Sequence, residues 1–79
     1  MATKKPPRGA KLQLTIEVER ETDGRWIAEI TDMPGVMAYG ATSEEACANV
    51  YALALRVVAD RVQDSQKLPE TITLARAAG

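Results

Sequence analysis

Hydrophobic and polar residues alternate without interruption from Lys11 to Arg20, in the segment KLQLTIEVER. The hydrophobic positions are Leu12, Leu14, Ile16 and Val18. Successive side chains of a strand point to opposite faces, so this pattern predicts a strand with one buried and one wet face. Trp26 to Ile30 is predicted to return beside it. Gly24 supplies the positive φ that the tight turn between the two strands requires.

The faces of the two strands fix their expected register. A three-residue loop, Thr22 to Gly24, places Trp26 opposite Arg20, and the same register pairs Val18 with Ala28 and Ile16 with Ile30. Trp26 then joins the core face with Ala28 and Ile30, whereas a one-residue slip would turn all three away from it. Ile27 is left on the outer face, together with Glu17, Glu19 and Glu29.

The rest of the chain predicts a corner, a strand, a helix and a last strand. Pro34 and Gly35 are typical of a type II turn, and Val36 to Ala41 is a short third strand. Thr42 and Glu45 fit a capping box at the start of a helix that runs from about Ser43 to Asp64. Thr71 to Ala75 alternates again and is expected to lie parallel to the first strand after a right-handed crossover.

These elements predict an α+β fold with the order β-β-β-α-β. Three antiparallel strands and a fourth strand form the sheet, and one long helix packs on one face of it. The helix carries more hydrophobic residues than one sheet contact requires. The extra side consists of Tyr51, Leu55, Val58 and Val62. Either the C-terminal segment covers this side within a thick core, or it is an oligomer interface, as in a dimer or tetramer.

Size and charge limit the range of proteins to consider. A chain of 79 residues forms one domain with a small core, for which oligomerisation is a natural supplement. Residues 1–10 are expected to form a flexible basic tail, which is either simply solvated or in contact with phosphates, and residues 11–79 the single domain. The net charge of -1 argues against a globally basic nucleic-acid binder. No long hydrophobic segment or signal peptide is evident, which predicts a cytoplasmic protein.

Candidate catalytic chemistry is sparse. The chain has no histidine, and its single cysteine, Cys47, lies on a hydrophobic helix position where a buried side chain is favoured over a reactive thiol. Glu17, Glu29 and Asp32 could form a carboxylate metal site, but alternate acids are also the usual way to keep a sheet face wet. Since no common catalytic or phosphate-binding motif is present either, we expect no enzyme, no catalytic residues, no metal and no cofactor.

The order of these local signals resembles the HicB-type antitoxin family, in a short form that contains only its N-terminal domain. The resemblance covers roughly Leu12 to Leu74. The matching residues are Asp23, Gly24, Trp26, Ala28, Glu29, Ile30, Pro34, Gly35, Gly40, Thr42, Glu44, Glu45, Ala46 and Asn49. It implies a partial ribonuclease-H-like fold and a non-catalytic protein that masks a small basic toxin, a HicA-type ribonuclease that cleaves mRNA.

The chain also departs from the family pattern. Relatives usually continue into a DNA-binding domain, whereas this sequence ends at Gly79, so direct DNA binding is not expected. Val36, Tyr39, Ala41 and Ser43 replace residues that are commonly different, which affects a possible partner surface. The alternative function is a stand-alone regulatory or RNA-associated domain of the same fold without a toxin. The candidate partner-binding residues are Ile27, Glu29 and Tyr39, because a hydrophobic residue rimmed by carboxylates suits a basic protein.

Overall fold

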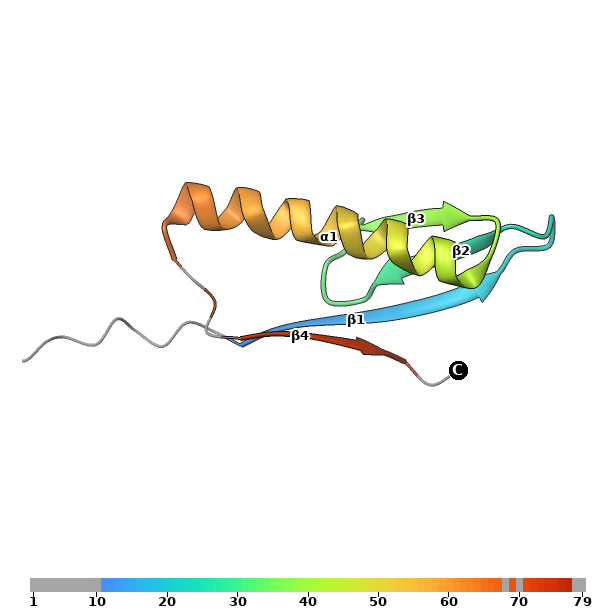
Figure 1. Ribbon diagram of the computed structural model, residues 1–79, viewed down its shortest axis with the longest axis horizontal. Helices are drawn as coiled ribbons and strands as arrows, with labels where there is room; N and C mark the ends of the chain where they lie inside the picture. Colours follow the sequence, from blue (N-terminus) through green and yellow to red (C-terminus); the bar gives the residue numbers. More distant parts are fainter. Residues whose placement is uncertain (1–10, 68, 70, 78–79) are drawn as a thin grey trace, which may run out of the picture.

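The computed structural model describes residues 11–67, 69 and 71–77, so the predicted tail at residues 1–10 lies outside the described part. The elements are β1 (Lys11–Arg20), β2 (Trp26–Ile30), β3 (Met37–Gly40), α1 (Ser43–Ser65) and β4 (Thr71–Arg76). They form a four-stranded mixed sheet in the order β3-β2-β1-β4 and one long helix (Figure 1). β4 runs parallel to β1, and the other strand pairs are antiparallel. The predicted α+β class and element order are confirmed.

The predicted hairpin register is confirmed at each of its three pairs. Arg20 lies opposite Trp26, Val18 opposite Ala28 and Ile16 opposite Ile30. The loop closes with a hydrogen bond of 3.0 Å from the Gly24 N–H to the Glu21 carbonyl, and Gly24 has a φ of 92°. A side chain at this φ would be strained, so glycine is what permits the three-residue loop and hence the register.

The Pro34–Gly35 corner is the predicted type II turn. Gly35 has a φ of 89°, and the Val36 N–H donates to the Met33 carbonyl at 3.1 Å. The turn also has a packing role that was not predicted from the sequence. It folds Met33 and Val36 inward, where they are 2% and 8% exposed. The corner therefore closes one end of the core.

The helix begins at the predicted cap. The Thr42 hydroxyl accepts a hydrogen bond from the Glu45 N–H at 3.0 Å. The Glu45 carboxylate reaches back to the Ala41 N–H, one residue earlier than the Thr42 N–H of a standard capping box. At the other end, Gln66 adopts a left-handed conformation and its N–H donates to the Val62 carbonyl. Both ends of the helix thus have local hydrogen bonds that compensate for the lost helical ones.

Thr42→Ala should lower the free energy of unfolding by about 0.5–2 kcal/mol, because the Glu45 N–H loses its acceptor at the start of the helix. Urea denaturation followed by circular dichroism measures the change. Thr42→Ser keeps the hydroxyl and serves as the control. Equal losses in the two variants would show that the hydroxyl does not act as the cap.

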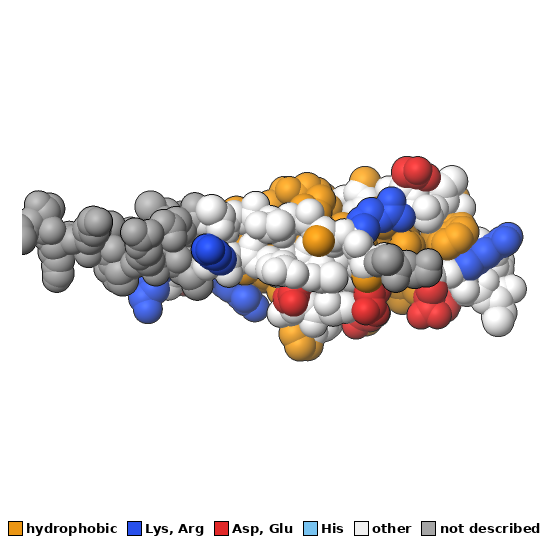
Figure 2. Space-filling view, turned by 90° about the horizontal axis from the view of Figure 1, so that it is seen from below, with side chains coloured by type: hydrophobic (Ala, Val, Ile, Leu, Met, Phe, Trp, Pro, Cys, Tyr) orange, Lys and Arg blue, Asp and Glu red, His pale blue; other side chains and the backbone are white. Residues whose placement is uncertain are grey.

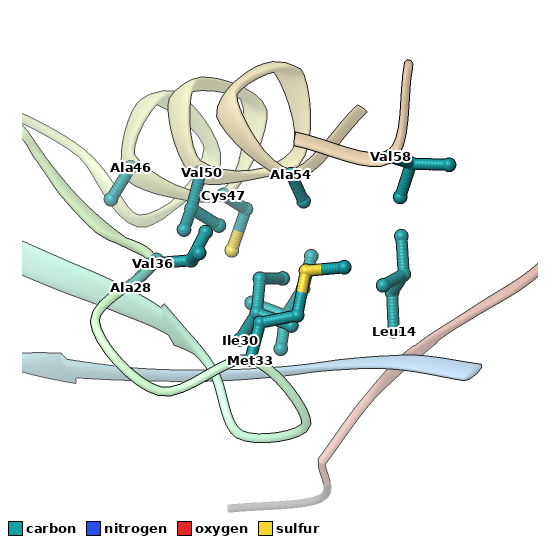
Figure 3. Close-up of a cluster of buried hydrophobic side chains, with 11 residues drawn as sticks. Leu14, Ala28, Ile30, Met33, Val36, Ala46, Cys47, Val50, Ala54 and Val58 are labelled. Carbon is teal, nitrogen blue, oxygen red and sulfur yellow. The ribbon is translucent and has the colours of Figure 1, made fainter. Parts of the chain in front are cut away.

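The core lies between the helix and the inner face of the sheet (Figure 3). Its buried side chains are Leu14, Ile16, Ala28, Ile30, Met33, Val36, Ala46, Cys47, Val50, Ala54 and Val58. Trp26 is half-buried and packs against this cluster, and Cys47 is buried as predicted. Since these side chains come from β1, β2, the corner and α1, the core ties the hairpin to the helix.

The helix covers only part of the sheet. It contacts β1, β2 and β3, whereas among the described residues no backbone contact joins it to β4. In Figure 1 the helix overlaps β2 and β3, and β4 lies clear of it. Among the described residues, no helix combines the length and hydrophobicity needed to span a membrane.

Candidate functional site

The outer face of the sheet, turned away from the helix, brings the three predicted partner-binding residues together. Ile27 lies in register between Glu19 of β1 and Tyr39 of β3. In the neighbouring row, Glu29 lies between Glu17 and Met37. Residues directly opposite one another in a sheet point to the same face, so these two rows form one surface. We call it the outer face and define it by Glu17, Glu19, Ile27, Glu29, Met37 and Tyr39.

A shallow depression of about 460 Å³ lies on the outer face. It is lined by Glu17, Val18, Glu19, Glu21, Ile27, Glu29 and Ala77. Acidic side chains gather along one border of the molecule when it is seen from the side of β4 (Figure 2). Such a surface can bind a cationic side chain in two ways at once. The carboxylates attract its charged group, and Ile27 packs against its methylene groups.

Tyr39 is held in place by contacts on both sides. The Arg25 guanidinium carbon lies 4.4 Å from the centre of the Tyr39 ring, and the Asn49 side-chain amide donates to the Tyr39 carbonyl at 3.0 Å. Arg25 is itself paired with Asp23 at 2.8 Å. The backbone N–H of Arg25 and then its guanidinium lower the pKa of the Asp23 carboxyl. Arg25 thus covers one face of the exposed Tyr39 ring, and Asn49 holds the backbone that carries it.

Two residues at this surface, Met37 and its neighbour Arg25, were not predicted. Met37 is 43% exposed, the same fraction as Tyr39, and Arg25 stacks on the tyrosine ring. Alternation within the third strand could have identified Met37, since it lies two residues before Tyr39 and therefore on the same face. The position of Arg25 lacks such a signal, because it follows from the conformation of the loop.

Asp32 does not join the other two acids of the candidate metal site. Its carboxylate accepts the Thr15 backbone N–H at 2.7 Å and so joins the chain after β2 to β1. Within the described residues, no group of three or more potential ligands lies close enough to hold a metal ion. Asp32 has a structural role in the connection between the strands.

The four residues of the predicted oligomer interface differ in their exposure. Leu55 is 38% exposed, and Tyr51 and Val62 are half-buried at the border of the core. Val58 was wrongly placed on this surface. It is 7% exposed and lies above Leu14 in the core (Figure 3). Its side chain belongs to the core because it points to Leu14 of β1.

The comparisons with known proteins assign no family. No protein-family model, no curated protein and no solved structure matches the chain.

Proposed function

We propose that this protein is a non-catalytic binding module of HicB antitoxin type that sequesters a small basic toxin, a HicA-type ribonuclease. The proposal includes a partial ribonuclease-H-like fold for the β-β-β-α-β chain. The observation that carries it is the outer face, where Ile27 and Tyr39 lie side by side in register and Glu17, Glu19 and Glu29 lie next to them. The family itself is suggested by the motif resemblance.

The charge of the outer face suits a basic partner. The chain carries eleven acidic side chains, and four of them line the depression around Ile27. Opposite charges on the two proteins accelerate their encounter, and burial of hydrophobic side chains then slows dissociation. Tyrosine is often among the residues that dominate binding energy, so Tyr39, restrained by Arg25 and Asn49, is the expected anchor.

The alternative, an RNA-associated domain, is less compatible with the same surface. RNA is a polyanion, and carboxylates on a binding face repel phosphates. Basic side chains on the docking surface of a protein partner are instead attracted by these carboxylates. The charge of the outer face therefore favours the antitoxin proposal over the alternative.

Co-expression with a HicA-type toxin encoded beside the gene tests the proposal. The wild-type chain should restore growth and co-purify with the toxin. Tyr39→Ala and Glu29→Lys should each weaken the complex by at least about tenfold, because they remove the anchor and reverse one of the contacting charges. Titration calorimetry on the purified proteins measures the dissociation constants.

Asp60→Lys is the matched control for Glu29→Lys. Asp60 is an exposed acid on the helix, away from the outer face, and its reversal changes the net charge by the same amount. It should leave the affinity nearly unchanged. If the wild-type chain neither restores growth nor binds the toxin, the proposed function is wrong.

A further inference from the structure

β4 leaves hydrophobic side chains uncovered at one edge of the sheet. Ile72 is 44% and Leu74 is 42% exposed, although both lie on the inner face, in register with Leu12 and Leu14. The helix does not reach them, because it contacts only the other three strands in the described part of the chain. Within the described residues, the inner face of β4 is therefore a hydrophobic surface that no other element covers.

Further hydrophobic side chains lie on the side of the helix that faces away from β3. Ala46 packs against Gly40, and Asn49 donates to Tyr39, so this side of the helix faces β3. At about 100° per residue, Tyr51, Leu55 and Val62 point to the opposite side, towards β1 and β4. We call the combined surface the apolar ledge and define it by Leu12, Tyr51, Leu55, Val62, Ile72 and Leu74.

In the part of the chain that the structure describes, β4 is also an edge strand, with one side of its backbone unpaired. The Ala77 N–H donates to the Ile16 carbonyl at 2.9 Å, so the backbone groups of Ala77 point towards β1. Backbone groups alternate in direction along a strand, which makes those of Ile72 and Leu74 point away from the sheet. β4 has no lysine or proline to block pairing at this edge. The other edge strand, β3, is only four residues long.

We propose that a second copy of this chain pairs with β4, antiparallel, around a two-fold axis at Thr73. In this register Ile72 of one copy lies opposite Leu74 of the other, and both residues direct their free N–H and carbonyl groups at each other. Thr73 faces its own counterpart. Two four-stranded sheets become one continuous sheet, with both helices on the same side of it.

The charge pattern favours a second copy over a different protein as the occupant. A two-fold interface brings a surface against itself, so a net charge on that surface would repel its copy. The apolar ledge contains no charged residue, and within β4 the one charged side chain is Arg76, at the end of the strand. In the dimer, the ledges of the two copies meet above the paired strands.

Cross-linking at the two-fold axis tests the register. Thr73→Cys places two thiols at a non-hydrogen-bonded pair, where Cα atoms are about 4.5 Å apart and a disulfide can form. Mild oxidation should convert most of this variant to a covalent dimer. Thr71→Cys is the matched control, since its two copies would be about 14 Å apart along the strands and should stay largely uncross-linked. The native Cys47 is buried and does not compete.

Sedimentation equilibrium of the full chain tests the association itself. The wild-type protein should have twice the mass of one chain, and Leu74→Glu should reduce it to a single mass with an unchanged circular dichroism spectrum. Met37→Glu, a similarly exposed hydrophobic residue on the opposite edge, should leave the dimer intact. A wild-type monomer, a dimer that survives Leu74→Glu, or equal cross-linking of Thr73→Cys and Thr71→Cys would overturn the proposal.

Discussion

Leu14→Ala is expected to lower the free energy of unfolding by about 2–5 kcal/mol. Leu14 has no exposed surface and lies beneath Val58, where the helix meets β1. The substitution removes its hydrophobic contacts and leaves a cavity that the helix and the strand cannot fully close. A domain of this size has a total stability of about 4–12 kcal/mol, so the variant should be close to unfolding.

Urea denaturation at a fixed protein concentration measures this loss, because self-association would otherwise change the apparent stability. Leu53 lies on α1 and is half-buried against the core. Leu53→Ala removes the same atoms as Leu14→Ala and should have a clearly smaller effect. A loss at Leu14 no greater than that at Leu53 would contradict the full burial of Leu14 in the core.

The local elements could be predicted because their signals are contained in short segments. Gly24, the Pro34–Gly35 turn and the Thr42 cap each determine a backbone conformation within a few residues, and all three are confirmed. The hairpin register then follows from the loop length together with the alternation of faces. The positions of Ile27 and Glu29 on the outer face depend only on this register, so they too could be predicted.

The packing of the helix could not be predicted in the same way. A helical wheel shows which residues share a side of a helix, but it does not show where the sheet below that side ends. Val58 was assigned to an interface for this reason, although β1 lies beneath it. The burial of Met33 depends on the path of the corner across the core, and the exposure of Leu74 depends on the helix stopping short of β4. The burial of Val58 and Met33 and the exposure of Leu74 depend on tertiary contacts, which local sequence patterns do not show.

The two exposed surfaces lie on different sides of the sheet and can act together. The outer face holds the acids around Ile27, whereas the apolar ledge lies on the helix side. A dimer formed through β4 would place two outer faces on the same side of one continuous sheet. Two linked copies of a weak binding face raise the effective affinity for a partner that presents two sites.

Gly40→Ala is expected to lower the free energy of unfolding by about 1–3 kcal/mol, because it forces apart two elements that are in close contact. A Cβ atom at this position would lie 2.9 Å from the Ala46 Cα, and backbone atoms cannot move aside as a flexible side chain can. The first turn of α1 would shift away from β3. The Asn49 hydrogen bond to the Tyr39 carbonyl should weaken with it.

Gly35 provides the comparison that identifies the cause. A Cβ there would meet no atom within 4 Å, but its φ of 89° disfavours a side chain. Gly35→Ala should therefore be costly for conformational reasons alone, and Gly35→Asn should recover part of the loss because asparagine tolerates a positive φ. Gly40→Asn should give no recovery relative to Gly40→Ala, since its Cβ meets the same backbone. Recovery at both positions would show that Gly40 is required for its backbone conformation and not for the close approach of the helix. Chemical denaturation of the four variants distinguishes the two causes.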